Sequence, residues 1–121
     1  MKIRNGFVSN SSSSSFIVTN ITDQTKTIND LIIELKNDLH TFRKDYGYNT
    51  KESREDYSLK AMLDTSYQME EGYRTFLPKE IKLMEVGNDT SPHRLGTFLE
   101  WAFRENCKTK SFKIEFDESH H

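Results

Sequence analysis

A run of consecutive serines near the start of the chain is the feature whose residue types could do chemistry. Ser11 to Ser15 follow Ser9 and Asn10, and Arg4 lies a few residues earlier. Serine hydroxyls, an asparagine amide and backbone N–H groups can together surround an anion, and a guanidinium adds a positive charge. The pattern predicts a binding site for phosphate or a nucleotide formed by Arg4, Ser9, Asn10, Ser11, Ser12 and Ser13.

Two other roles for the serine run stay open on the sequence alone. Gly6 is the only glycine near the run, and the chain has no GxxxxGK[ST] pattern, so the residues that usually let a backbone approach a phosphate are missing. Apolar residues flank the run on both sides: Ile3, Phe7, Val8, Phe16, Ile17 and Val18. The run therefore also fits a structural loop whose hydroxyls satisfy backbone groups, or a segment that docks onto a partner or is modified.

Neither nucleophilic catalysis nor metal binding has a defined pattern in this chain. A serine nucleophile needs a histidine base that a third group orients, and no spacing selects one of the 4 histidines. His120 and His121 could chelate a transition metal, but no HxxxH or CxxC spacing accompanies them. Cys107 is the only cysteine, which excludes an internal disulfide, and we interpret it as a small buried side chain. We therefore expect no catalytic residue, no metal and no cofactor.

Tyrosines set among charged residues predict a protein contact in the middle of the chain. Tyr46, Tyr48 and Tyr57 lie in a segment of mixed charge, and tyrosine is enriched where proteins meet. The edge of a core would suit the same residues. Our prediction is that these three side chains lie at an interface with a partner protein.

Hydrophobic periodicity predicts the helices that must position these residues. Between 27 and 46 apolar residues recur at three- and four-residue steps, which is typical of an amphipathic helix with Thr27 as its N-cap. A more polar helix is expected from about 53 to 69. A third should follow Ser91 as N-cap, with Pro92 at the first helical position, where a missing N–H has no cost.

Alternating apolar residues predict strands at Ser15 to Thr19, Glu80 to Val86 and Ser111 to Phe116. Lys2 to Val8 is a candidate for a further strand that pairs with the first one through the serine run. Together these elements predict one α+β domain in which a small, mainly antiparallel sheet is covered by about three helices. Its expected parts are a serine-rich motif and strand (1–20), a helical region (27–71) and a β-α-β end (78–121), within a single domain of residues 1–121.

Composition and charge narrow the function classes. The chain is 34% hydrophobic and 12% aromatic, and disordered chains are poor in aromatic residues, so we expect a folded domain. Its 17 basic and 19 acidic residues give a net charge of −2, too small to attract a phosphate backbone, so nucleic acid is not an expected partner. No apolar stretch approaches the length of a membrane span or follows Lys2 and Arg4 as a secretion signal would.

The first residues resemble a known group of proteins. The residues that carry the likeness are Lys2, Ile3, Arg4, Gly6, Phe7, Val8, Ser9, Asn10, Ser11 to Ser15 and Phe16. Small uncharacterised proteins from bacteriophage and prokaryotic genomes begin with the same pattern, and many also end in one or two histidines, as this chain does at His120 and His121. The resemblance implies a phage-like origin and carries no known activity.

This origin, the small size and the lack of a catalytic pattern lead to one expected function. We expect a non-enzymatic accessory protein that works by protein–protein interaction in the cytoplasm of a host cell. It would bind and modulate a host or phage protein, for example as an inhibitor of a host defence factor. Two alternatives remain: a small ligand- or nucleotide-binding protein or enzyme that uses the serine run, and a structural or virion component. The sequence leaves the oligomeric state open.

Overall fold

The computed structural model of the protein describes residues 13–45, 57–90 and 92–117. Within these ranges the fold is α+β, as the sequence predicts. Several residues singled out above lie outside the described residues: Arg4, Ser9, Asn10, Ser11, Ser12, Tyr46, Tyr48, His120 and His121. The strand expected at Lys2 to Val8 lies outside them too.

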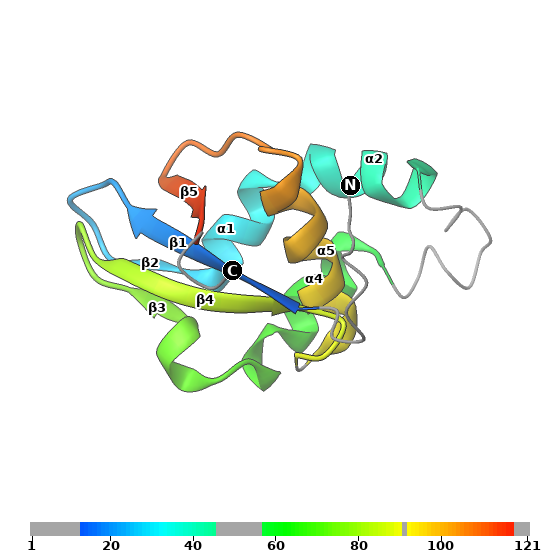
Figure 1. Cartoon of the computed structure of the whole chain (residues 1–121), viewed down its shortest axis with the longest axis horizontal. Helices are drawn as coiled ribbons and strands as arrows, with labels where there is room; N and C mark the ends of the chain where they lie inside the picture. The colour runs from blue at the N-terminus through cyan, green and yellow to red at the C-terminus, as the bar shows by residue number, and fades with distance from the viewer. Residues whose placement is uncertain (1–12, 46–56, 91, 118–121) are drawn as a thin grey trace.

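The sheet is built around the first described strand. β1 (Ser13–Asn20) pairs antiparallel with β4 (Ile81–Gly87) on one edge and with β5 (Phe112–Phe116) on the other, in the order β4-β1-β5. A separate two-stranded antiparallel pair joins β2 (Lys26–Thr27) to β3 (Thr75–Phe76). The mainly antiparallel sheet is therefore confirmed, and its central strand comes first in the described sequence (Figure 1).

Four α-helices lie within the described residues: α1 (Ile28–Glu34), α2 (Lys36–Asp45), α4 (Leu59–Thr65) and α5 (His93–Arg104). Two short 3-10 helices follow α4, η1 (Ser66–Gln68) and η2 (Glu71–Tyr73). α5 packs on the sheet, and α2 and α4 pack on α5 (Figure 1). No helix in the described part of the chain is long and apolar enough to cross a membrane.

Among the described residues, helices pack on one face of the sheet. Along β1 the residues Phe16, Val18 and Asn20 are buried, whereas Ile17 and Thr19 between them are partly exposed. This alternation follows from the strand geometry, which points successive side chains to opposite faces. α5 covers the buried face, where the rings of Phe16 and Phe103 meet edge-on with their centroids 5.2 Å apart.

The serine run enters the sheet rather than ending before it. The sequence places the first strand at Ser15 to Thr19, but Ser13 and Ser14 already belong to β1, opposite Gly87 and Val86. Serine is not a strong strand former, and the pairing with β4 overrides its local preference. Between Phe16 and Thr19 the two edges of β1 are paired with β4 and β5, and the further strand predicted at Lys2 to Val8 stays a prediction.

The first predicted helix is interrupted at Leu35. Its start is confirmed, because Thr27 and Asp30 form the reciprocal hydrogen bonds of a capping box. At Leu35 the backbone leaves helical geometry (φ −99°, ψ 12°), and the chain continues as α2. Leu35 N–H still bonds to the carbonyl of Leu31 (3.1 Å). The three- and four-residue spacing of apolar residues continues through Leu35, so the sequence pattern does not predict this interruption.

The second predicted helix is shorter than expected. α4 begins after Ser58, whose hydroxyl accepts a hydrogen bond from the N–H of Ala61 (3.0 Å). Its last turn is closed by Thr65, whose hydroxyl donates to the carbonyl of Ala61 (2.9 Å), and the chain then tightens into η1. Residues 57 and 58 are not helical and α4 ends at Thr65, so the prediction of one continuous helix to 69 is wrong, and its predicted start at about 53 lies outside the described residues.

The third predicted helix begins one residue later than expected. Pro92 is the N-cap of α5, with extended backbone geometry (φ −78°, ψ 140°), and its carbonyl accepts from Gly96 N–H (2.9 Å). Gly96 also lets α5 approach the end of β4, because a Cβ there would overlap Thr90 Oγ1 and the carbonyl oxygen of Gly87. A larger residue at Gly96 would therefore push the helix off the sheet.

Candidate functional site

Ser13, the one predicted anion-site residue that the structure describes, lies beside a carboxylate. It faces the side of the sheet that α5 does not cover, and its hydroxyl donates to Glu85 Oε2 across a long 3.4 Å contact. A carboxylate repels an anion at this distance. The position of Ser13 therefore gives no support to a phosphate site, and the rest of the predicted site lies outside the described residues.

Ser14 points to the opposite face and joins a polar cluster with two residues of α5. Its hydroxyl donates to Glu100 Oε2 (2.6 Å) and accepts from Arg104 Nη2 (2.6 Å). Arg104 Nε also contacts Glu100 Oε2 (3.3 Å). Burial raises the pKa of the Glu100 carboxyl, and the Ser14 and Arg104 contacts oppose this rise. These bonds tie the start of the central strand to the helix that covers it.

Asn20, at the other end of β1, makes several hydrogen bonds through its side chain. It is fully buried, and its amide nitrogen donates to the carbonyls of Gln24, Phe76 and Leu77 at 2.8 to 3.1 Å. Its side-chain oxygen accepts from the N–H and the hydroxyl of Thr22. Because these protein partners use its donors and acceptor, Asn20 holds the loop after β1 against the loop before β4.

Tyr57, the one predicted interface tyrosine that the structure describes, is 8% exposed. Its ring packs on Phe42 with the centroids 5.5 Å apart, and its carbonyl accepts from Arg43 Nη1 (2.8 Å). A side chain this buried offers a partner little surface. The prediction of a contact at Tyr46 and Tyr48 stays open, since both lie outside the described residues.

Cys107 is a poor nucleophile in this environment. Burial, together with the nearby Asp38 carboxylate, raises the pKa of its thiol to about 12. The thiol is therefore protonated at neutral pH, and the thiolate is the reactive species. Among the described residues no group of three or more histidine, cysteine, aspartate or glutamate side chains could hold a metal ion.

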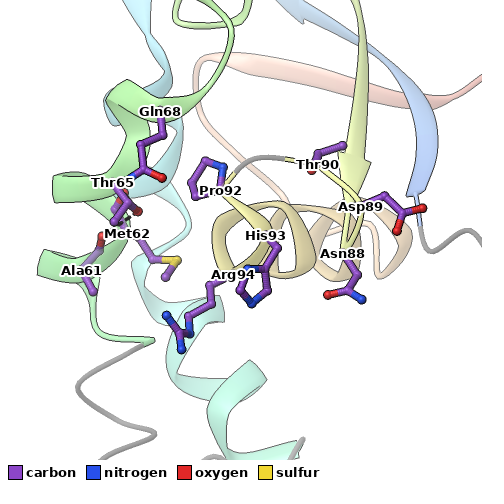
Figure 2. A pocket seen from close by; sticks show the side chains of 10 residues that line it. All are labelled: Ala61, Met62, Thr65, Gln68, Asn88, Asp89, Thr90, Pro92, His93 and Arg94. Atoms are coloured by element: carbon purple, nitrogen blue, oxygen red, sulfur yellow. Dashed lines mark hydrogen bonds between the residues drawn. The ribbon is translucent and has the colours of Figure 1, made fainter.

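A polar cavity of about 510 Å³ lies between α4 and the start of α5. Figure 2 shows residues of α4 and η1 on one side and the turn after β4 with the first turn of α5 on the other. Its lining consists of Ala61, Met62, Thr65, Gln68, Asn88, Asp89, Thr90, Pro92, His93 and Arg94. His93 and Arg94 are exposed, and Arg94 reaches from α5 toward α4 (Figure 2). The cavity can admit a small polar ligand, with Arg94 as the cation of its lining, whereas the Asp89 carboxylate points away from α4 (Figure 2).

A second surface feature is the sheet face opposite α5, which we call the open face. It carries Ser13, Ser15, Ile17, Thr19, Ile81, Leu83, Glu85, Lys113 and Glu115. Ile81 is 68% exposed and Leu83 is 51% exposed, and Leu83 lies directly opposite Ile17 of the central strand. Three neighbouring aliphatic side chains thus face outward, with charged residues beside them.

The alternation along the strands could have identified the open face from the sequence. Ile81 and Leu83 share one side of β4, but the alternation alone does not show which side of the sheet a helix covers. The chain itself matches no protein-family model, no curated protein and no solved structure. The resemblance of its first residues to phage proteins therefore stays a prediction, and the function must be argued from the surfaces themselves.

Proposed function

We propose that this chain is a non-enzymatic, phage-type accessory protein that binds another protein of the host or the phage and alters its activity. Inhibition of a host defence factor is one example of such a role. The observation that supports this proposal is the open face, where Ile17, Ile81 and Leu83 form an aliphatic patch on the sheet.

A patch of this kind has the composition of a protein contact. Single exposed aliphatic residues are common on protein surfaces, but neighbouring ones rimmed by polar residues mark surfaces that other proteins cover. Here the patch is bordered by Glu85 at one end and by Lys113 and Glu115 along β5. An apolar centre within a polar rim is the usual anatomy of an interface.

Affinity capture with paired variants tests this proposal. Leu83→Glu places a charge in the open face, whereas Leu77→Glu places one at a similarly exposed leucine (57%) that lies outside the strands. The wild-type chain and Leu77→Glu should retain the same partner from host or infected-cell lysate, and Leu83→Glu should lose it. A partner that all three chains capture equally would show that the open face is not the contact surface.

The alternative, a ligand-binding protein, is supported by the cavity between α4 and α5. A ligand that binds only the folded state raises the unfolding temperature, and at about 100 times its dissociation constant it adds about 2.7 kcal/mol. A thermal-shift screen of nucleotides, dinucleotides and inorganic phosphate should be run with the wild type, Arg94→Ala and Arg4→Ala. A shift lost only in Arg94→Ala would favour this cavity, and one lost only in Arg4→Ala would favour the serine run.

A structural or virion component remains the third proposal. The serine run supports it only through the position of Ser13 and Ser14, which continue the central strand at its N-terminal end. Nothing on the described surface separates this role from regulatory binding. The lysate experiment does so, because an assembly partner would be a structural phage protein.

A further inference from the structure

We propose that the open face binds the open face of a second copy of this chain, in a two-fold symmetric dimer. The inference rests on the proposed role of this face as a protein-contact surface. It states that a second copy of the chain covers the face when no other partner is bound. What supports it is the order of apolar and charged residues across the three strands.

Two neighbouring rows of residues cross the three strands at the centre of the open face, and we call each row a level. One level ends in a positive residue and the other in a negative residue. One level consists of Ile81, Thr19 and Lys113, and the next consists of Leu83, Ile17 and Glu115. Each level runs from an exposed aliphatic residue on β4, through β1, to a charged residue on β5. The side chains of Lys113 and Glu115 are well exposed, and within one chain Lys113 Nζ lies 3.9 Å from Glu115 Oε1.

One two-fold rotation makes this pattern complementary to itself. An axis across the strands at the level of Val18 keeps β4 over β4 and β5 over β5 and reverses the strand direction. Ile81 then lies over Leu83 of the partner subunit, and Lys113 lies over Glu115 of the partner subunit. Because the axis is two-fold, both contacts occur twice, as in any isologous interface.

A rotation about an axis along the strands does not give this match. It places β4 over β5, so that Ile81 meets Lys113 of the partner subunit and Leu83 meets Glu115 of the partner subunit. Both contacts would bury a charge against an aliphatic side chain without a counter-ion, which is costly. The positions of the charged residues therefore favour one defined dimer arrangement over non-specific association.

The size of the face predicts a weak dimer. Strand rise and spacing give a footprint of about 20 Å by about 14 Å, or roughly 300 Å². Stable complexes usually bury about 800 Å² on each partner. We therefore expect dissociation in the micromolar range or above, which suits a cover that a stronger binding partner can displace.

Sedimentation equilibrium of the full chain, up to about 0.5 mM, tests the dimer in the range where contacts of this size dissociate. Lys113→Glu and Glu115→Lys each place like charges across the interface twice, so each variant should self-associate about tenfold more weakly than the wild type. An equimolar mixture of the two variants restores opposite charges at both contacts. The mixture should form a heterodimer about tenfold tighter than either variant forms with itself.

Leu83→Glu should abolish the dimer, whereas Leu77→Glu should leave it unchanged. If both charge variants self-associate as tightly as the wild type, and their mixture shows no preference for the heterodimer, the proposed arrangement is overturned. A wild type that is monomeric at every concentration would overturn self-association itself, and the lysate experiment then decides about the proposed function separately. A monomeric wild type whose unfolding temperature falls strongly in Leu83→Glu would instead show that the chain's own residues cover the face, which also overturns the dimer.

Discussion

The two faces of the central strand differ in what covers them, although they share one backbone. On the face toward α5, Phe16 and Val18 are buried to 1% and 0% exposure. On the open face, Ile17 and Thr19 stay partly exposed, and their neighbours Ile81 and Leu83 are more exposed still. The difference is that one face has a helix of its own chain as its partner and the other has none among the described residues.

This comparison separates side chains that hold the fold from side chains that are available for binding. A residue on the α5 side is removed from water by the chain itself, so its burial contributes to the free energy of unfolding. An equally apolar residue on the open face contributes little until another surface covers it. The faces should therefore respond in opposite ways, with stability changed on one side and association on the other.

The largest effect is expected from truncating the central strand on its buried side. Phe16→Ala removes a ring that packs edge-on against Phe103 and Phe116, and such cavities cost about 3 to 5 kcal/mol. Ile17→Ala, one residue further on the open face, should cost under about 1.5 kcal/mol. Chemical denaturation of both variants measures the contrast. Similar costs at the two sites would mean that the open face is covered too.

A smaller loss is expected where α5 meets the end of β4. Gly96→Ala adds a methyl group that overlaps the Gly87 carbonyl and the Thr90 hydroxyl, and overpacking of this kind costs about 1 to 3 kcal/mol. Gly72→Ala is the matched control, because a Cβ at that glycine has nothing within 4 Å. Thermal unfolding should rank Gly96→Ala clearly below Gly72→Ala. A neutral Gly96→Ala would mean that α5 shifts freely on the sheet.

The polar cluster of Ser14, Glu100 and Arg104 should make the free energy of unfolding depend on pH. Burial raises the pKa of Glu100 above its usual 4.5, so the folded state binds this proton more tightly than the unfolded state does. Stability of the wild type relative to Glu100→Gln should therefore increase as the pH falls from 7 toward 4.5, and level off below it. Denaturant unfolding across this range measures the difference, with Glu105→Gln as an exposed control. A difference that shrinks on acidification would contradict the assignment.

The smallest effect on stability is expected in the centre of the open face. Leu83→Gln, measured under dilute conditions, should change the free energy of unfolding by no more than about 0.5 kcal/mol, because the side chain is already half exposed. The same substitution should weaken self-association in sedimentation experiments. A large loss of stability with unchanged association would reverse the roles assigned to the two faces.

The sequence predicted the parts of the fold that depend on neighbouring residues. Thr27 and Asp30 lie three positions apart, so their capping box can be recognised without any tertiary information. The alternation in β4 and β5 likewise depends on short spacing, and both strands were placed within one residue of their observed ends. The interruption at Leu35 escaped because the apolar spacing continues through it.

The candidate sites were harder to predict, because their parts are far apart in the chain. Ser14 meets Glu100 and Arg104 only because β1 lies under α5, and no spacing in the sequence records that contact. Tyr57 was expected at an interface from its charged neighbours, yet it packs against Phe42. A tyrosine has an apolar ring and a polar hydroxyl, so its type alone does not determine whether it lies at a surface or at the edge of the core.

The sequence by itself determined that the chain forms an α+β fold, where most of its strands lie and which of their residues share a face, because these follow from caps and from a two-residue period. Only the tertiary structure decided that the serine run continues as the central strand and that α5 covers just one side of it. That choice depends on pairings between residues about 60 to 100 positions apart. It left Ile17, Ile81 and Leu83 facing outward beside the charged residues of β5, which is the arrangement on which the proposed binding function rests.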